Sequence, residues 1–314
     1  MEKYKGFVDD SAWVDWNPDP EIFRIPGTDH PVVWYGLFFA LAFVGSHVVM
    51  NKIFKTENRT AKELDRLTLY VIVGTVLGAR LGHCLFYGPL WDGPNGEVGY
   101  LSHPLNILKV WEGGLASHGG AIGILLALIL YSRKTKESIW WILDRIVVVV
   151  ALSSTFIRMG NLMNSEIIGK ITNSPFGFRF IQHDIEINYG GVNTFMKQPD
   201  DVRAMFIQSI PARHPSQLYE GLFYLILFAS FFFLWKKKKN TWPKGFMFGL
   251  YITLMFLFRF LIEFTKEVQV DWESGKLLDM GQMLSIPFVL AGIAIMIIAK
   301  KKNQLHALRP EPVK

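Results

Sequence analysis

A polar cluster follows directly after an apolar stretch in the middle of the chain. Residues 158–169 read RMGNLMNSEIIG, immediately after IVVVVALSSTFI. The cluster contains Arg158, Asn161, Asn164 and Glu166, at a point where a hydrophobic segment would be leaving a membrane. Unpaired charges and hydrogen-bond donors are costly in hydrocarbon. The run therefore predicts a binding site at the depth of the bilayer, in which the asparagines and the glutamate bind a phosphate or glycerol group. Asparagines that tie helix ends together or cap irregular backbone are the alternative.

Three arginines, Arg80, Arg158 and Arg259, stand inside or at the ends of apolar segments. The guanidinium group is permanently charged and its planar fork matches phosphate oxygens. In a membrane, this chemistry indicates a phospholipid headgroup. The alternative is salt bridging between helices, because Arg259 and Glu263 are spaced i,i+4 and would neutralise each other on one helix face.

His118 lies in the sequence SHGG, where glycines allow a backbone or a ligand to approach closely. A histidine in such a place is a candidate general base. A hydrogen-bonded packing histidine is the commoner arrangement and stays open. No cluster of His, Asp and Glu has metal-ligand spacing, and neither a P-loop nor a dinucleotide fingerprint occurs. We therefore expect no metal and no cofactor.

The composition is typical of a membrane protein. Of 314 residues, 50% are hydrophobic and only 19% are charged, whereas a soluble domain has about 25% charged residues. The net charge of +6 comes from short basic clusters between apolar runs, such as 236–239 and 300–302. This pattern belongs to membrane topology and excludes a basic groove for nucleic acid. The single cysteine, Cys84, lies in an apolar run and is expected to be a packing residue.

The apolar segments predict an all-α polytopic membrane protein with seven transmembrane helices. The expected spans are about 32–50, 67–90, 113–131, 139–157, 217–235, 245–265 and 280–299. Lys and Arg concentrate in alternate connections, which places the N-terminus outside and the C-terminus in the cytoplasm. We expect an extracytoplasmic segment 1–31, a membrane catalytic domain 32–300 and a cytoplasmic tail 301–314. Residues 170–213, with turns and β-prone stretches, are expected to form a small extracytoplasmic insertion.

All seven expected spans carry polar side chains toward their outer ends, and this agreement in depth favours one shared site. A transporter would instead place polar groups along a path through both leaflets. A non-catalytic phospholipid-binding scaffold remains an alternative. The residues concerned are Tyr35, Arg80, His83, His118, Arg158, Asn161, Asn164, Glu166, Gln217, Tyr219, Glu220, Arg259, Glu263 and Gln282.

The run 158–169 resembles the signature of prolipoprotein diacylglyceryl transferases, G-R-x-G-N-F-x-N-x-E-x-x-G. Ile157 replaces the first glycine and Leu162 the phenylalanine, while the other fixed positions match. Lys266 stands where the family often has an arginine. Further stretches agree in order: WYG at 34–36, GARLGH at 78–83, HGG at 118–120, RHPSQLYE at 213–220, FRFLIEF at 258–264 and MGQMLSIP at 280–287.

The resemblance implies an enzyme of the bacterial plasma (inner) membrane whose active site faces the outer leaflet. Such an enzyme transfers diacylglyceryl from phosphatidylglycerol to the lipobox cysteine in the signal peptide of a preprolipoprotein. A thioether forms, glycerol-1-phosphate is released, and lipoprotein maturation begins. The reacting thiol belongs to the substrate, so the enzyme needs no cysteine nucleophile of its own.

On this basis we assign expected roles to the polar residues. His118, Arg158, Arg259 and Glu263 are the expected catalytic residues, with His118 or Glu263 as the base and the arginines on the phosphate. The expected substrate-binding residues are Arg158, Tyr35, Arg80, Asn161, Asn164, Glu166, Gly169, Gln217, Tyr219, Glu220 and Gln282.

Overall fold

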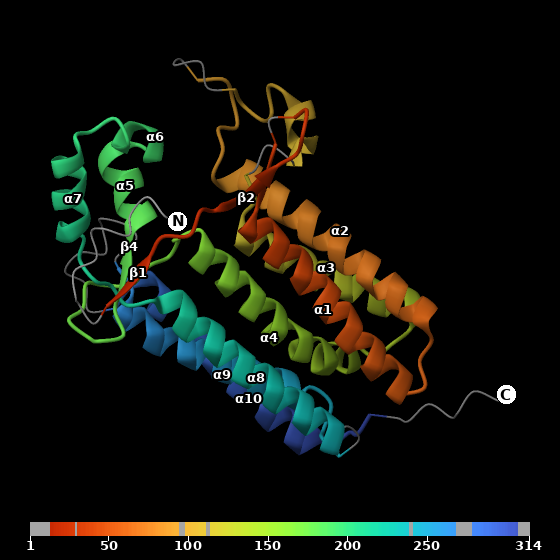
Figure 1. The fold of residues 1–314 in the computed structure, drawn as a ribbon. Coiled ribbons are helices and arrows are strands. Elements are labelled where there is room, and N and C mark those ends of the chain that lie inside the picture. The colour runs from red at the N-terminus through yellow and green to blue at the C-terminus, as the bar shows by residue number, and fades with distance from the viewer. Residues whose placement is uncertain are drawn as a thin grey trace. The chain divides into compact units, whose positions relative to one another are not determined.

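The computed structural model describes residues 13–28, 30–93, 98–110, 114–238, 241–267 and 278–306, and long helices dominate it (Figure 1). Each predicted span overlaps one of these helices, with ends that differ by up to six residues, and the predicted start of the third span at residue 113 lies outside the described residues. The helices are α1 (Trp34–Thr56), α2 (Ala61–Phe86), α3 (Ser117–Thr135), α4 (Ile139–Met163), α8 (Ser216–Lys238), α9 (Phe246–Ile262) and α10 (Met280–Lys302). A short 3₁₀ turn, η4 (Glu263–Thr265), continues α9.

Six of these helices are long and apolar enough to cross a membrane: α1, α2, α4, α8, α9 together with η4, and α10. The prediction of a helical, polytopic membrane protein is thereby confirmed. The helix over the predicted third span, α3, is not among the six. Its first turn is rich in glycine and its last turn carries Arg133 and Lys134, which shortens its apolar part. The count of seven spans and the direction of the termini stay predictions.

The chain divides into two compact units, each of which is described by itself. The first comprises Met1–Ser46, Val147–Lys239 and Phe246–Asn303. The second comprises His47–Ile146, Asn240–Gly245 and Gln304–Lys314. The predicted region 32–300 thus contains parts of both units, and its boundaries stay predictions.

The insertion 170–213 belongs to the first unit and has a hydrophobic core of its own. Three helices, α5 (Ile181–Tyr189), α6 (Val192–Phe195) and α7 (Asp200–Ser209), make up much of it. Its buried core residues are Ile181, Ile185, Phe195, Ile207 and Ile210. Of the β-prone stretches expected in the insertion, one forms a short strand, β4 (Phe178–Phe180). Other aromatic and branched residues of the insertion pack in the core between its helices.

Two small sheets accompany the N-terminal segment in the same unit. Strand β1 (Val14–Trp16) pairs with β4 in parallel, and the side chain of Arg179 donates to Asp15 at 2.6 Å. Strands β2 (Glu21–Arg24) and β3 (Pro31–Val33) form an antiparallel pair just before α1. The N-terminal segment is therefore tied to the base of the insertion.

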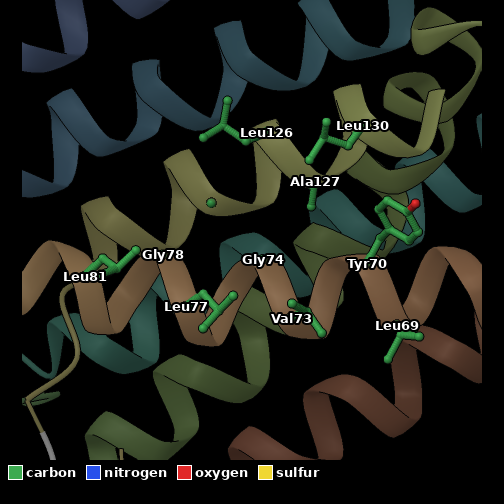
Figure 2. A pocket seen from close by; sticks show the side chains of 11 residues that line it. Leu69, Tyr70, Val73, Gly74, Leu77, Gly78, Leu81, Leu126, Ala127 and Leu130 are labelled. Carbon is green, nitrogen blue, oxygen red and sulfur yellow. The ribbon is translucent and has the colours of Figure 1, made fainter. Parts of the chain in front are cut away.

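Glycines bring α2 and α3 into close contact in the second unit. A Cβ atom added at Gly119 would lie 2.8 Å from the Cα of Gly82, and one added at Gly123 would lie 2.9 Å from the Cα of Gly78. Small residues permit such approach between helices. An apolar groove of about 420 Å³ runs along the same two helices, between Leu69 and Leu81 on α2 and beside Leu126 and Leu130 on α3 (Figure 2). The glycines after His118 thus serve helix packing and leave α3 unbroken.

This packing predicts that two neighbouring glycines tolerate alanine very differently. In Gly119→Ala the new methyl meets the α2 backbone, so we expect a destabilisation of about 1–3 kcal/mol from overpacking. In the control Gly120→Ala the methyl would make an ordinary contact of 3.6 Å with Ala79, so stability should be unchanged or slightly higher. Thermal unfolding of both variants in detergent measures the difference. Equal melting temperatures would contradict the close α2–α3 contact.

Candidate active site

The polar run begins in the last turns of α4 and continues as a tight loop. Helix α4 ends at Met163, and Ser165 and Ile167 then adopt left-handed backbone with φ of 53° and 57°. Gly169 closes the loop, since its N–H donates to the carbonyl of His214 at 2.9 Å. A Cβ atom at Gly169 would come within 2.6 Å of His214 and of Ser216, which explains why glycine is needed there.

The polar side chains of this run form one hydrogen-bonded network. Asn161 and Asn164 donate to the two carboxylate oxygens of Glu166, at 3.1 and 2.9 Å. Arg158 donates to the side-chain oxygen of Asn161 at 3.2 Å, and Gln217 donates to the carbonyl of Glu166 at 2.5 Å. Both asparagines thus donate to a side chain of the loop after α4 and not to its backbone. The network also fixes the position of Arg158.

Glu220 is the anion at the centre of the site. Its buried carboxylate forms ion pairs with Arg158 on α4 and with Lys266 after η4, the latter at 2.5 Å. The Glu220 side chain is only 2% exposed and that of Lys266 only 6%. A buried ion removed from such an arrangement leaves its partners uncompensated, at a cost of roughly 3–5 kcal/mol. Glu220 therefore holds two cations from different segments in fixed places.

Arg259 on α9 differs from these cations, because no described residue forms an ion pair or a hydrogen bond with it. The alternative that Arg259 and Glu263 neutralise each other is wrong. Glu263 lies 3.5 Å from Lys266 instead. A Cβ atom at Gly281 would lie 3.0 Å from an oxygen of Glu263, so this carboxylate packs against the first turn of α10. A helix N-terminus favours a nearby anion.

Among the described residues, Arg259 is the one cation of the site without an ion pair. Arg158, Lys266 and Arg259 are cations, and Glu220 and Glu263 are the carboxylates among them. Glu166 is a third carboxylate in the network of Arg158; it accepts from two neutral amides and forms no ion pair with a described residue. The arrangement suits a ligand with a single negative charge, such as a phosphodiester, at Arg259.

Other predicted residues of the first unit shape the site. The ring of Tyr35 packs against Gly160, since a Cβ atom added at Gly160 would lie 2.9 Å from this ring. Glu166 and Arg158 are the charged groups that interact with the Tyr35 hydroxyl group. The hydroxyl oxygen of Tyr219 lies 3.4 Å from the ring nitrogen Nδ1 of His214. Gln282 is buried, accepts from the N–H of Asp279 and donates to the carbonyl of Phe260 at 3.3 Å. Gln282 thereby links the ends of α9 and α10.

Arg80 and His118 belong to the second unit. Arg80 is buried and donates to the carbonyls of Asn106, Ile107 and Gly114 at 2.6, 3.0 and 3.2 Å. These bonds engage all three guanidinium nitrogens in holding the connection between α2 and α3. His118 is exposed in the first turn of α3.

Two residues of the site were not among the predicted ones. Lys266 completes the ion pairs of Glu220. Tyr224 is 4% exposed. Its hydroxyl group interacts with Arg158 and with the charged groups of Glu220 and Arg259. The sequence could have indicated Tyr224, because residues 217, 220 and 224 are spaced three and four apart and therefore share one face of a helix.

Comparison with known proteins agrees with the resemblance in the sequence. A profile of the family described as prolipoprotein diacylglyceryl transferase matches residues 20–298. A phosphatidylglycerol–prolipoprotein diacylglyceryl transferase of Tolumonas auensis is 41% identical over 290 residues, which cover 92% of this chain and 98% of the relative. The protein of that name from Porphyromonas gingivalis is 43% identical over 297 residues, with 92% and 96% covered. One from Bacteroides fragilis is 38% identical over 304 residues, with 93% and 97% covered. The chain therefore belongs to the prolipoprotein diacylglyceryl transferase family.

Proposed function

We propose that this protein transfers the diacylglyceryl group of phosphatidylglycerol to the lipobox cysteine of prolipoproteins, the first step of lipoprotein maturation. Its relatives carry the name of this activity over nearly their whole length. The observation that carries the proposal is Arg259, a half-buried arginine without an ion pair among the described residues, beside cations fixed by Glu220. A phosphodiester is the anion that matches this charge and the membrane setting.

The reaction makes one carbon–sulfur bond and breaks one carbon–oxygen bond. The cysteine sulfur attacks the glycerol carbon that carries the phosphate ester, and glycerol-1-phosphate leaves with the bonding electrons. Negative charge then grows on the departing phosphate. Arg259 and Arg158 stabilise this charge, and Arg158 does so without rearranging, since Glu220 and Asn161 already hold it in place.

Of the remaining residues, some contact the lipid and others hold the catalytic side chains or the surrounding backbone in place. Tyr35 and Asn161 orient the headgroup beside Arg158. Glu220, Gly169, Tyr219 and Gln282 act on the geometry of the site through the contacts described above. We assign Arg80 a supporting role as well, because its guanidinium nitrogens already donate to backbone carbonyls.

The proposed topology has seven spans, with α3 as the seventh span in addition to the six apolar helices. Its 19 residues reach about 28 Å, close to the thickness of the hydrocarbon core. The alternation of basic connections supports an external N-terminus, a cytoplasmic C-terminus and a site open to the outer leaflet of the plasma membrane. Phosphatidylglycerol and the signal peptide of the preprolipoprotein then meet at the outer leaflet.

The thiol proton needs an acceptor, and we propose His118 in preference to Glu263. The carboxylate of Glu263 is already engaged by Lys266 and by the first turn of α10. His118 is exposed at the start of a helix and carries a group suited to proton transfer near neutral pH.

Arg259→Gln should abolish most of the transfer activity while the protein still folds. Losing one positive charge at the departing phosphate should reduce kcat roughly 10²–10³-fold. Arg259→Lys should keep part of the rate, since it retains the charge without the fork. The assay follows a thioether-linked lipopeptide formed from phosphatidylglycerol and a lipobox peptide in detergent. The control Arg24→Gln removes an exposed arginine paired with Glu21 and should be fully active. A fully active Arg259→Gln enzyme would exclude Arg259 from the phosphate site.

His118→Gln should lower the rate by roughly 10²–10⁴-fold near neutral pH, because the thiol then lacks its proton acceptor. The defect should shrink above the ordinary thiol pKa of about 8.5, where the peptide ionises without help. The Arg259→Gln defect should persist at the same pH, since it concerns the phosphate. The measurement is the transfer rate of both variants between pH 7 and about 9.5. Full activity of His118→Gln at pH 7 would remove histidine from this role.

A further inference from the structure

Three buried oxygen atoms around Glu166 lack a hydrogen-bond partner anywhere in the described ranges. They are the side-chain carbonyl oxygens of Asn164 and Gln217 and the hydroxyl oxygen of Ser165. Gln217 is completely buried and Ser165 is 3% exposed. Buried polar groups without partners are rare in folded proteins because each costs free energy. Three of them around one residue point to a ligand that supplies the missing hydrogen bonds.

The hydrogen bonds around Glu166 explain why the amide oxygens of Asn164 and Gln217 lack partners while their amide nitrogens do not. The amide nitrogen of Asn164 donates to the carboxylate of Glu166, and that of Gln217 donates to its backbone carbonyl. Glu166 thereby fixes the orientation of both amides. Ser165, with its left-handed backbone, lies between Asn164 and Glu166 in the chain. Asn164 and Gln217 therefore offer acceptors only, and their partner must be a donor.

The chemistry of the neighbouring groups limits which donor fits. An ammonium group also donates hydrogen bonds, but Glu166 would attract it and Arg158 of the same network would repel it, so the local charges do not select a cation. Hydroxyl groups donate without carrying charge. A ligand that places a phosphate at the arginines and two hydroxyl groups a few atoms further on satisfies both parts of the site.

We propose that Asn164, Ser165 and Gln217 bind the two free hydroxyl groups of the glycerol headgroup of phosphatidylglycerol. This inference rests on the proposed function and adds the means of headgroup selection. The headgroup glycerol leaves together with the phosphate, so the enzyme holds its leaving group at both ends. Phospholipids with the same charge but without the diol are then poor donors.

Phosphatidylmethanol tests this proposal, because it keeps the phosphodiester and its charge but lacks both hydroxyl groups. Wild-type protein in mixed micelles should prefer phosphatidylglycerol at least about tenfold in kcat/KM, since the three oxygens stay unpaired with the analogue. Asn164→Ala and Ser165→Ala should each bring this ratio several-fold closer to one.

Ser165→Ala gives a second readout that a structural role would not produce. The serine hydroxyl has no partner to lose within the described residues, so its removal should leave the melting temperature unchanged or raise it. The matched control is Asn188→Ala on α5, whose side chain donates to the carbonyl of Asp184 at 2.8 Å. It should leave the lipid preference unchanged.

Different failures separate the two proposals. Equal turnover of the two lipids by wild-type protein would overturn the headgroup site and leave the transferase function standing. Variants that slow both lipids by the same factor would also overturn it, because they would show a structural role only. A wild-type protein that converts neither lipid would overturn the proposed function together with this inference.

Discussion

The site depends on one buried carboxylate, that of Glu220, held between Arg158 and Lys266. Charges inside a membrane protein are costly unless they are paired, so these groups keep their positions only as a set. Glu220 and Glu263 pair with Arg158 and Lys266, whereas Arg259 has no ion pair among the described residues. We propose that this division between paired and unpaired arginines makes the polar cluster a site for one phosphate.

The same carboxylate links segments that are far apart in the sequence. Arg158 comes from the end of α4 and Lys266 from the residues after η4, while Glu220 lies in the first turns of α8. Backbone bonds support this arrangement at the base of the insertion, where the N–H of Lys170 donates to the carbonyl of Thr265 at 2.8 Å. Arg213 pairs with Glu267 beside it. The insertion is thereby anchored to the segment that carries Lys266.

Sequence patterns predicted the helices and the polar run well, since hydrophobic length and intramembrane charge are local properties. They failed where a helix ends. The i,i+4 spacing of Arg259 and Glu263 assumes a continuous helix, but α9 stops at Ile262 and a 3₁₀ turn carries Glu263 toward Lys266. The hydrogen bonds of Arg80 to distant carbonyls and the burial of Lys266 depend on tertiary packing, which no spacing reveals.

A double-mutant cycle between Glu220 and Lys266 tests the central claim most directly. The free energy of unfolding in detergent would be measured for Glu220→Gln, for Lys266→Met and for the double variant. The account predicts that Glu220→Gln alone costs roughly 3–5 kcal/mol, because it removes the buried carboxylate from Arg158 and leaves Lys266 with Glu263 alone. The double variant should recover part of this loss, with a coupling energy of about 1–3 kcal/mol. Strictly additive effects of the two substitutions would contradict an account in which Glu220 holds Lys266 in the site.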